Sequence, residues 1–242
     1  MKKILFYTIM SLLISGNVVN AQSMKVVYQE QLKTPDKVKE LDNPAIAAAI
    51  AAQLSKMGKT MVLYYEKGES FFGQLSSENK EQSGFQNNVQ VQVIQQSGSG
   101  SYYKNQKKSE SVSQEYIMDK AFLITEPLNS EWKLISEEKK VGNYSCKKAV
   151  NNNNVIAWYC PEIPVKEGPY LFCGLPGLIL EIEMPAKTIS MQSVDFESGV
   201  KDKIKVPSTG KKISRDEFNK LFEKRKTELG VDGKNPITVR KM

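Results

Sequence analysis

Residues 173–183 read CGLPGLILEIE, and this stretch joins a tight turn to an apolar strand. Two glycines and a proline within residues 174–177 favour the turn. The alternation that follows predicts a strand whose Leu178, Leu180 and Ile182 side chains face the core. Residues 174–179 carry no nucleophile, base or good metal ligand. We therefore predict that this corner is structural and that any functional surface lies elsewhere.

The N-terminus has the three parts of a secretory signal peptide. Two lysines precede an apolar run over residues 4–14, and VNA at residues 19–21 is a small-residue cleavage pattern. The run is too short to span a bilayer, which needs about 20 apolar residues. We expect residues 1–21 to be removed and residues 22–242 to form one domain, exported to the periplasm or beyond. No cysteine follows Ala21, so a lipoprotein is not expected.

The composition excludes several classes of function. The formal net charge is +7, but lysines alternate with acids, without the dense basic block and interleaved aromatics of a nucleic-acid-binding surface. The chain has no histidine, which excludes Ser-His-Asp and Cys-His catalysis and His-containing zinc sites. No stretch beyond the N-terminus is long and apolar enough to cross a membrane. An enzyme would have to use carboxylate, lysine, tyrosine or thiolate chemistry.

Two segments carry strong helix signals. Residues 44–57 are rich in alanine, with Asn43 or Asp42 placed to cap the first turn and apolar residues at helical spacing. Ser214 and Glu217 form a capping box before the second helix, with Ile213 and Phe218 as its hydrophobic staple. Both helices have one apolar side, so we expect them to pack on a sheet.

The rest of the chain predicts strands. Short β-rich runs separated by turns indicate one antiparallel sheet laid down as a meander. Residues 76–100 are polar, and we predict a flexible segment there with a weak edge strand at residues 89–93. Residues 201–206 predict a lysine-rich edge strand, and residues 236–239 a short strand. We expect a β-dominated α+β fold: a curved antiparallel sheet or half-open barrel covered by one or two helices.

The clearest hairpin surrounds four asparagines at residues 151–154, because asparagine tolerates left-handed backbone angles. If the turn pairs Val150 with Val155, the side chains of Cys146 and Cys160 lie on opposite faces of the sheet. A bond between these two cysteines would then need a register slip.

The chain resembles the GLPGLI family of secreted Bacteroidetes proteins, which is named for the string at residues 174–179. The residues of that string are Gly174, Leu175, Pro176, Gly177, Leu178 and Ile179. The flanking matches lie at residues 132–135, 142–149, 157–164 and 168–169. The resemblance covers roughly residues 115–196. The activity of the family is uncharacterised, so the resemblance implies no catalytic residues.

Two cysteines depart from the family pattern. Cys160 stands where the family usually has threonine, and Cys173 where it has a small residue such as glycine. A bond between them would close a short loop, and this is the disulfide that we predict for an exported chain. The alternative is that no cysteine is paired.

Candidate binding and catalytic residues are few. Trp132, Trp158 and Tyr159 are candidates for lining a ligand groove, although aromatic residues more often pack in a core. Glu181 and Glu183 share one face of a strand and suggest either a carboxylate dyad or calcium site, or a pair that faces solvent. The solvent-facing pair is the preferred interpretation, so we predict no catalytic, metal or cofactor-binding residue.

These observations favour an exported non-enzymatic protein that binds an apolar ligand or an envelope protein in the concavity of its sheet. The alternatives are a secreted hydrolase that uses carboxylates and a structural component of an outer-membrane complex. A large apolar pocket would favour ligand binding, converging acids in a cleft would favour an enzyme, and a flat apolar patch would favour a protein partner.

Overall fold

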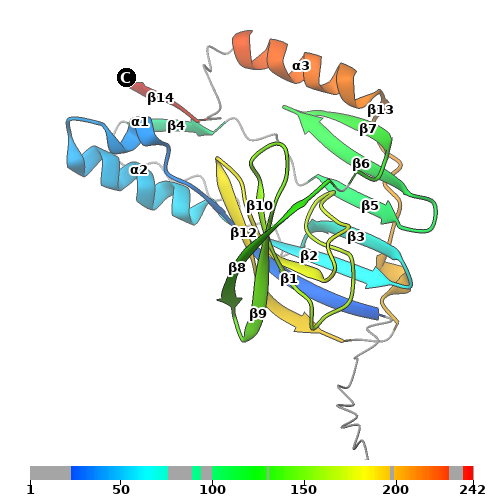
Figure 1. Ribbon diagram of the computed structural model, residues 1–242. Helices are drawn as coiled ribbons and strands as arrows, with labels where there is room; N and C mark the ends of the chain where they lie inside the picture. Colours follow the sequence, from blue (N-terminus) through cyan, green and yellow to red (C-terminus); the bar gives the residue numbers. More distant parts are fainter. Residues whose placement is uncertain are drawn as a thin grey trace, which may run out of the picture.

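The computed structural model describes residues 23–75, 89–93, 100–129, 131–196, 199–228 and 237–241. The predicted signal peptide and most of the polar segment at residues 76–100 lie outside the described residues. Strands dominate the described chain and form a large, open, curved sheet (Figure 1), which confirms the predicted fold class.

Twelve strands form the large sheet, in the spatial order β13-β7-β6-β5-β3-β2-β1-β12-β11-β10-β9-β8. Their bounds are β1 Ser23–Leu32, β2 Lys59–Glu66, β3 Glu69–Gln74, β5 Ser101–Asn105, β6 Glu110–Ile117, β7 Lys120–Pro127, β8 Lys133–Val141, β9 Tyr144–Val150, β10 Ile156–Cys160, β11 Leu178–Glu183, β12 Lys187–Asp195 and β13 Lys211–Lys212. All neighbours are antiparallel except β13, which runs parallel to β7. Most of the sheet is therefore the predicted meander.

β1 lies at the centre of this order and joins two meanders. It pairs with β2 on one side and with β12 on the other, so it links the early strands to the late ones. Its side chains alternate strictly, and Met24, Val26 and Tyr28 are fully buried on one face. This alternation fixes the register with β2, because a slip of one residue would expose the whole apolar set, whereas the pairing with β12 shifts by one residue between Val27 and Tyr28.

Residues 161–177 leave the sheet between β10 and β11 and pack back over it. Ile163, Val165 and Leu175 of this crossover belong to the main core cluster. The crossover is tied to the start of β11, where the Leu178 amide donates to the Ile163 carbonyl. The Tyr28 hydroxyl donates to the Ile179 carbonyl at 2.8 Å. The crossover therefore lies against the face to which the central strand directs its apolar side chains.

The first predicted helix is present as α2 (Pro44–Lys56), preceded by the short helix α1 (Asp36–Lys39). The Asn43 side chain caps α2 by accepting from the Ala45 and Ile46 amides, as predicted. Ile50 and Leu54 are buried against Val38 and Leu32. The helix therefore packs on α1 and the end of β1.

The second predicted helix is α3 (Arg215–Glu228), and its capping box is confirmed. The Glu217 carboxylate accepts from the Ser214 amide, and the Ser214 hydroxyl accepts from the Glu217 amide. Phe218 packs on Phe122 and Ile124 of β7, so α3 lies over the β6–β7 end of the sheet (Figure 1). No helix among the described residues is long and apolar enough to cross a membrane.

The predicted edge strand at residues 201–206 is wrong. The short 3-10 helix η1 (Lys201–Lys203) occupies this region, and the edge strand is β13 instead. Tertiary contacts explain the difference: Lys201 pairs with Glu69, and Ile204 packs on the Tyr103 cluster. These contacts fold the segment over the sheet surface instead of aligning it with an edge.

A second, two-stranded sheet contains the remaining strands. β4 (Val89–Val93) is the predicted weak strand, and it pairs antiparallel with β14 (Ile237–Lys241) near the C-terminus. The predicted C-terminal strand is thus also present, one residue later than expected.

Candidate functional site

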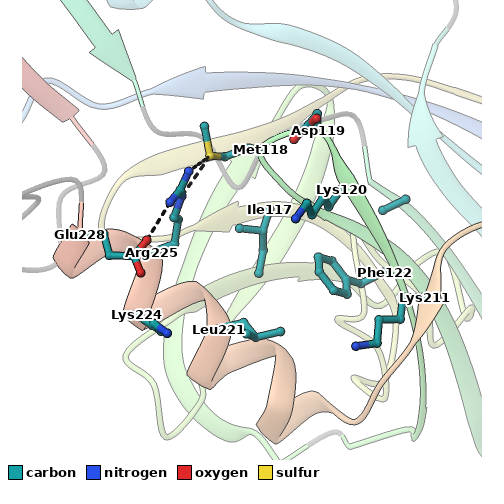
Figure 2. A pocket seen from close by; sticks show the side chains of 11 residues that line it. Ile117, Met118, Asp119, Lys120, Phe122, Lys211, Leu221, Lys224, Arg225 and Glu228 are labelled. Carbon is teal, nitrogen blue, oxygen red and sulfur yellow. Dashed lines mark hydrogen bonds and ion pairs between the residues drawn. The ribbon is translucent and has the colours of Figure 1, made fainter.

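A cavity of about 660 Å³ lies between α3 and the β6–β7 hairpin (Figure 2). Its apolar surface comes from Ile117, Ala121 and Phe122 on the hairpin and from Leu221 on the helix. Phe218 is the buried residue of α3, so the following turns of the helix stand away from the sheet. The cavity is the space beneath those turns.

The rim of this cavity is mainly cationic. Lys120, Lys211, Lys224 and Arg225 line it, together with Asp119 and Glu228. Arg225 pairs with Glu228 at 2.7 Å and donates to the Met118 sulfur, which links the helix to the hairpin turn (Figure 2). The three lysines make no ion pair with any residue that the structure describes. Positive charge is therefore left at the mouth of an apolar space.

Two large apolar side chains at this mouth are solvent-accessible. Met118 is 50% exposed and Leu221 is 42% exposed. The Met118 backbone has a φ of +58°, which closes the two-residue turn between β6 and β7 and directs the hairpin tip towards α3. An isolated exposed apolar residue is ordinary, but two beside an apolar cavity form a continuous surface for a ligand.

The three aromatic residues predicted to line a groove do not line this cavity. Each of them makes its own contacts elsewhere in the structure. Trp132 packs against Phe172 in a tilted arrangement and donates to the Cys173 carbonyl. Trp158 lies under the Lys139 ammonium, 4.3 Å from the ring centroid. Tyr159 is only 4% exposed, within the main core. Trp158 and Tyr159 thus have packing roles, and none of the three contributes to the site.

Glu181 and Glu183 form an ion-pair network on the sheet. Lys139 lies 2.5 Å from Glu181 and 3.2 Å from Glu183, Trp158 donates to Glu183, and Ser190 donates to Glu181. Burial raises the pKa of Glu183, but the hydrogen bonds from Trp158 and Lys139 outweigh it and lower that pKa. The expected solvent-facing pair is therefore half-buried and ion-paired with Lys139. The described residues hold no group of three or more acids and cysteines placed for a metal.

A fully buried ion pair was not predicted. Lys104 of β5 lies 2.7 Å from Glu167 of the crossover, and both side chains are 0% exposed. The ammonium also donates to the carbonyls of Gly168 and Phe172. Ser70 and Gln106 donate to the Glu167 carboxylate. With these partners on both sides, the pair clamps the crossover to β3 and β5.

A second polar cluster fixes the same crossover at the β1–β12 side. Tyr170 donates to Glu30, and Lys187 lies 2.9 Å from Glu30 and 2.6 Å from the Tyr170 hydroxyl. Burial raises the pKa of Glu30, but Lys187 and the Tyr170 hydroxyl outweigh it and lower that pKa. Burial and the Glu30 charge raise the pKa of Tyr170, so this phenol stays protonated and donates. The cluster is therefore a structural anchor.

Comparison with known proteins gives one family match and one fold. A family model described as a protein of unknown function, Porph_ging, matches residues 149–181. No curated protein matches the chain. A solved structure of PNGF-II in space group P21 superposes with a TM-score of 0.50 at 15% identity over 84% of this chain and 33% of that chain. This chain thus spans about a third of that one, and the likeness shows the fold alone.

The matched segment contains the glycine corner predicted to be structural. Gly174 has a φ of +90°, in the left-handed region that favours glycine. A Cβ on Gly177 would lie 2.2 Å from the Cys160 carbonyl oxygen, so only glycine fits this approach. Leu178 and Ile179 are both fully buried. The corner therefore ends the crossover and begins β11, and Ile179 is buried beside the alternate residues that were expected to face the core.

The register of the β9–β10 hairpin differs from the prediction. Val150 pairs with Ile156, because Val155 belongs to the turn. The Asn151 side chain accepts from the Val155 amide at 3.0 Å, and the Asn151 amide donates to the Val155 carbonyl. This shift of one residue places Cys146 opposite Cys160 on the same face. All three cysteines are free, so the predicted bond between Cys160 and Cys173 is not present.

Proposed function

We propose that the chain is an exported, non-enzymatic protein of the GLPGLI family that binds a single-chain anionic amphiphile, such as a fatty acid. The family assignment is supported by the string at residues 174–179, which lies inside the segment matched by the Bacteroidetes-associated family of unknown function. The export assignment is supported by the signal-peptide pattern at residues 1–21.

The observation that carries the ligand class is the cavity beneath α3, which has an apolar floor and a cationic mouth. Its volume of about 660 Å³ lies within the range of small-molecule sites. An acyl chain would cover Ile117, Phe122 and Leu221, and its carboxylate would face Lys120, Lys211 and Lys224. Each methylene removed from water contributes about 0.8 kcal/mol, against the cost of association. We expect micromolar affinity for a medium-length acyl chain.

The other functions considered have less support. The hydrolase would need Glu181 or Glu183 as a base or acid, but both are ion-paired with Lys139. A purely apolar ligand would not use the lysines of the rim. An envelope protein with an acidic apolar segment would use the same surface in place of a fatty acid.

Binding is tested with residues 22–242 and dansyl-labelled undecanoic acid, whose fluorescence rises in an apolar site. The matched variants are Lys224→Glu on the rim and Lys220→Glu, which makes the same charge change one turn earlier on α3 at an exposed position outside the cavity. We expect about tenfold weaker binding for Lys224→Glu, equivalent to roughly 1.4 kcal/mol, and unchanged binding for Lys220→Glu.

Two further measurements separate the contributions of charge and apolar contact. Leu221→Asp places a carboxylate at the apolar wall and should abolish probe binding, and circular dichroism checks that the fold is retained. The wild type should bind the methyl ester of the probe more weakly than the acid. Lys224→Glu should bind the ester and the acid with equal affinity. Absence of probe binding, or equal binding by all variants, would overturn the proposal. Binding of acidic peptides without binding of the acid would favour the protein partner.

A further inference from the structure

The β9–β10 hairpin brings two cysteines into register. Ala149 pairs with Ala157 and Lys147 pairs with Tyr159, so the next position places Cys146 opposite Cys160. Directly opposed residues of an antiparallel pair project to the same face, with Cβ atoms about 4.5–5.5 Å apart. A disulfide needs Cβ atoms about 3.5–4.5 Å apart and Cα atoms about 4.4–6.8 Å apart. A small closing movement of the two strands therefore satisfies its geometry.

The side-chain contacts agree with this placement. The Cys146 thiol donates to the Tyr144 carbonyl at 3.8 Å, and both cysteines are 0% exposed. The interaction between the two thiols lowers the pKa of Cys160 to about 7 against the opposing effect of burial and raises the pKa of Cys146. The two sulfurs thus already face one another, with Cys160 the better nucleophile.

The third cysteine has a different environment. Burial raises the pKa of the Cys173 thiol, and the charged groups nearest to it are Lys104 and Glu167. Its side chain contacts Gln106, and its carbonyl accepts from Trp132. Cys173 therefore belongs to the clamp of the crossover and is the thiol left over.

We propose that Cys146 and Cys160 form a cross-strand disulfide when the chain folds in the presence of a small-molecule or protein disulfide. The Cys160 thiolate attacks one sulfur of the external disulfide and displaces one thiolate, giving a mixed disulfide. Cys146 then loses its proton, and its thiolate attacks the Cys160 sulfur and displaces the second thiolate. Two cysteine thiols are oxidised, the external disulfide is reduced to two thiols, and these take up the two protons.

The bond would brace the start of the crossover. Cys160 is the last residue of β10, and its carbonyl accepts from the Ile163 amide where residues 161–177 leave the sheet. The same carbonyl is the atom that Gly177 approaches at the other end of the crossover. Joining Cys160 to β9 fixes the point at which both ends of the crossover meet.

The test is refolding of residues 22–242 with oxidised glutathione or with excess reduced glutathione, followed by alkylation and tryptic peptide mapping without reduction. Lys147 and Lys148 separate Cys146 from Cys160, and Lys166 separates Cys160 from Cys173, so each cysteine has its own peptide. We expect the oxidised protein to show one titratable thiol and a linked pair of Cys146 and Cys160 peptides. Its midpoint of urea unfolding should exceed that of the reduced protein.

Single variants provide the controls. Cys173→Ser should keep the linked peptides and leave no titratable thiol after oxidation. Cys146→Ser should give no linked peptides and should keep two titratable thiols after oxidation. If this variant folds poorly, the peptide map of the wild-type protein still identifies the bond. A linked Cys160–Cys173 peptide pair, or three titratable thiols after refolding with oxidised glutathione, would overturn the proposal.

Discussion

Replacing Lys104 with methionine removes the ammonium from the buried ion pair while keeping most of the side-chain volume. Both members of the pair are fully buried, so Lys104→Met leaves the Glu167 carboxylate in the interior without a counter-charge. Breaking a buried pair from one side costs about 3–5 kcal/mol, which is a large part of the 5–15 kcal/mol that stabilises a typical domain. The Gly168 and Phe172 carbonyls also lose a donor.

Urea unfolding followed by tryptophan fluorescence measures this loss, because Trp132 hydrogen-bonds to the adjacent crossover. The double variant Lys104→Met/Glu167→Gln should recover about 2 kcal/mol or more relative to the sum of the single variants, since it removes both charges. The control is Lys148→Met, which breaks the partly exposed pair with Glu137 and should cost at most about 1 kcal/mol. A Lys104→Met cost no larger than that of the control would refute the reasoning, as would strictly additive single variants.

Three further predictions concern the crossover and the second helix. Gly177→Ala should destabilise the protein by about 1–3 kcal/mol, measured by urea unfolding, because the new methyl meets the Cys160 carbonyl oxygen at 2.2 Å; an unchanged midpoint would contradict this. The folded-state pKa of Glu30 lies below its unfolded value, so its contribution is fully present above about pH 5 and is lost as the pH falls through the folded pKa. Glu30→Gln should therefore lose less stability than the wild type between pH 7 and pH 3, and parallel curves would count against it. Ser214→Ala should cost about 1 kcal/mol in thermal unfolding, and no change would show that the capping box is energetically silent.

Local signals in the sequence were sufficient for the helices. Asn43 before Pro44, and Ser214 with Glu217, satisfy backbone amides within one turn, so their effect needs no tertiary partner. The glycine corner was also predictable, because the backbone geometry at Gly174 restricts the residue type directly. Such features depend only on residues close in the chain.

The features that sequence reasoning missed depend on contacts between distant residues or on one side-chain choice. Lys104 and Glu167 are far apart in the chain, and the alternation of β5 gives no sign that a lysine is buried there. The observed register of the β9–β10 hairpin differs from the predicted one because the Asn151 side chain accepts a hydrogen bond from the Val155 amide, which places Val155 in the turn. The helix was expected to pack on the sheet through its apolar side, yet Leu221 lies at the mouth of a cavity because Phe218 is the residue of α3 that is buried against β7.

The structural and ligand-binding roles fall on different parts of the chain. The family match at residues 149–181 covers the crossover and its Glu167 and Tyr170 anchors, whereas the cavity is built by residues 117–122 and 211–228. The match therefore bears on how the sheet is braced and leaves the ligand to be argued from the cavity itself. Because the two regions share no side chain, a substitution at Lys104 should lower stability without changing probe affinity. A substitution at Lys224 should change affinity without lowering stability, and a variant that changed both would show that the crossover and the cavity are coupled through the sheet.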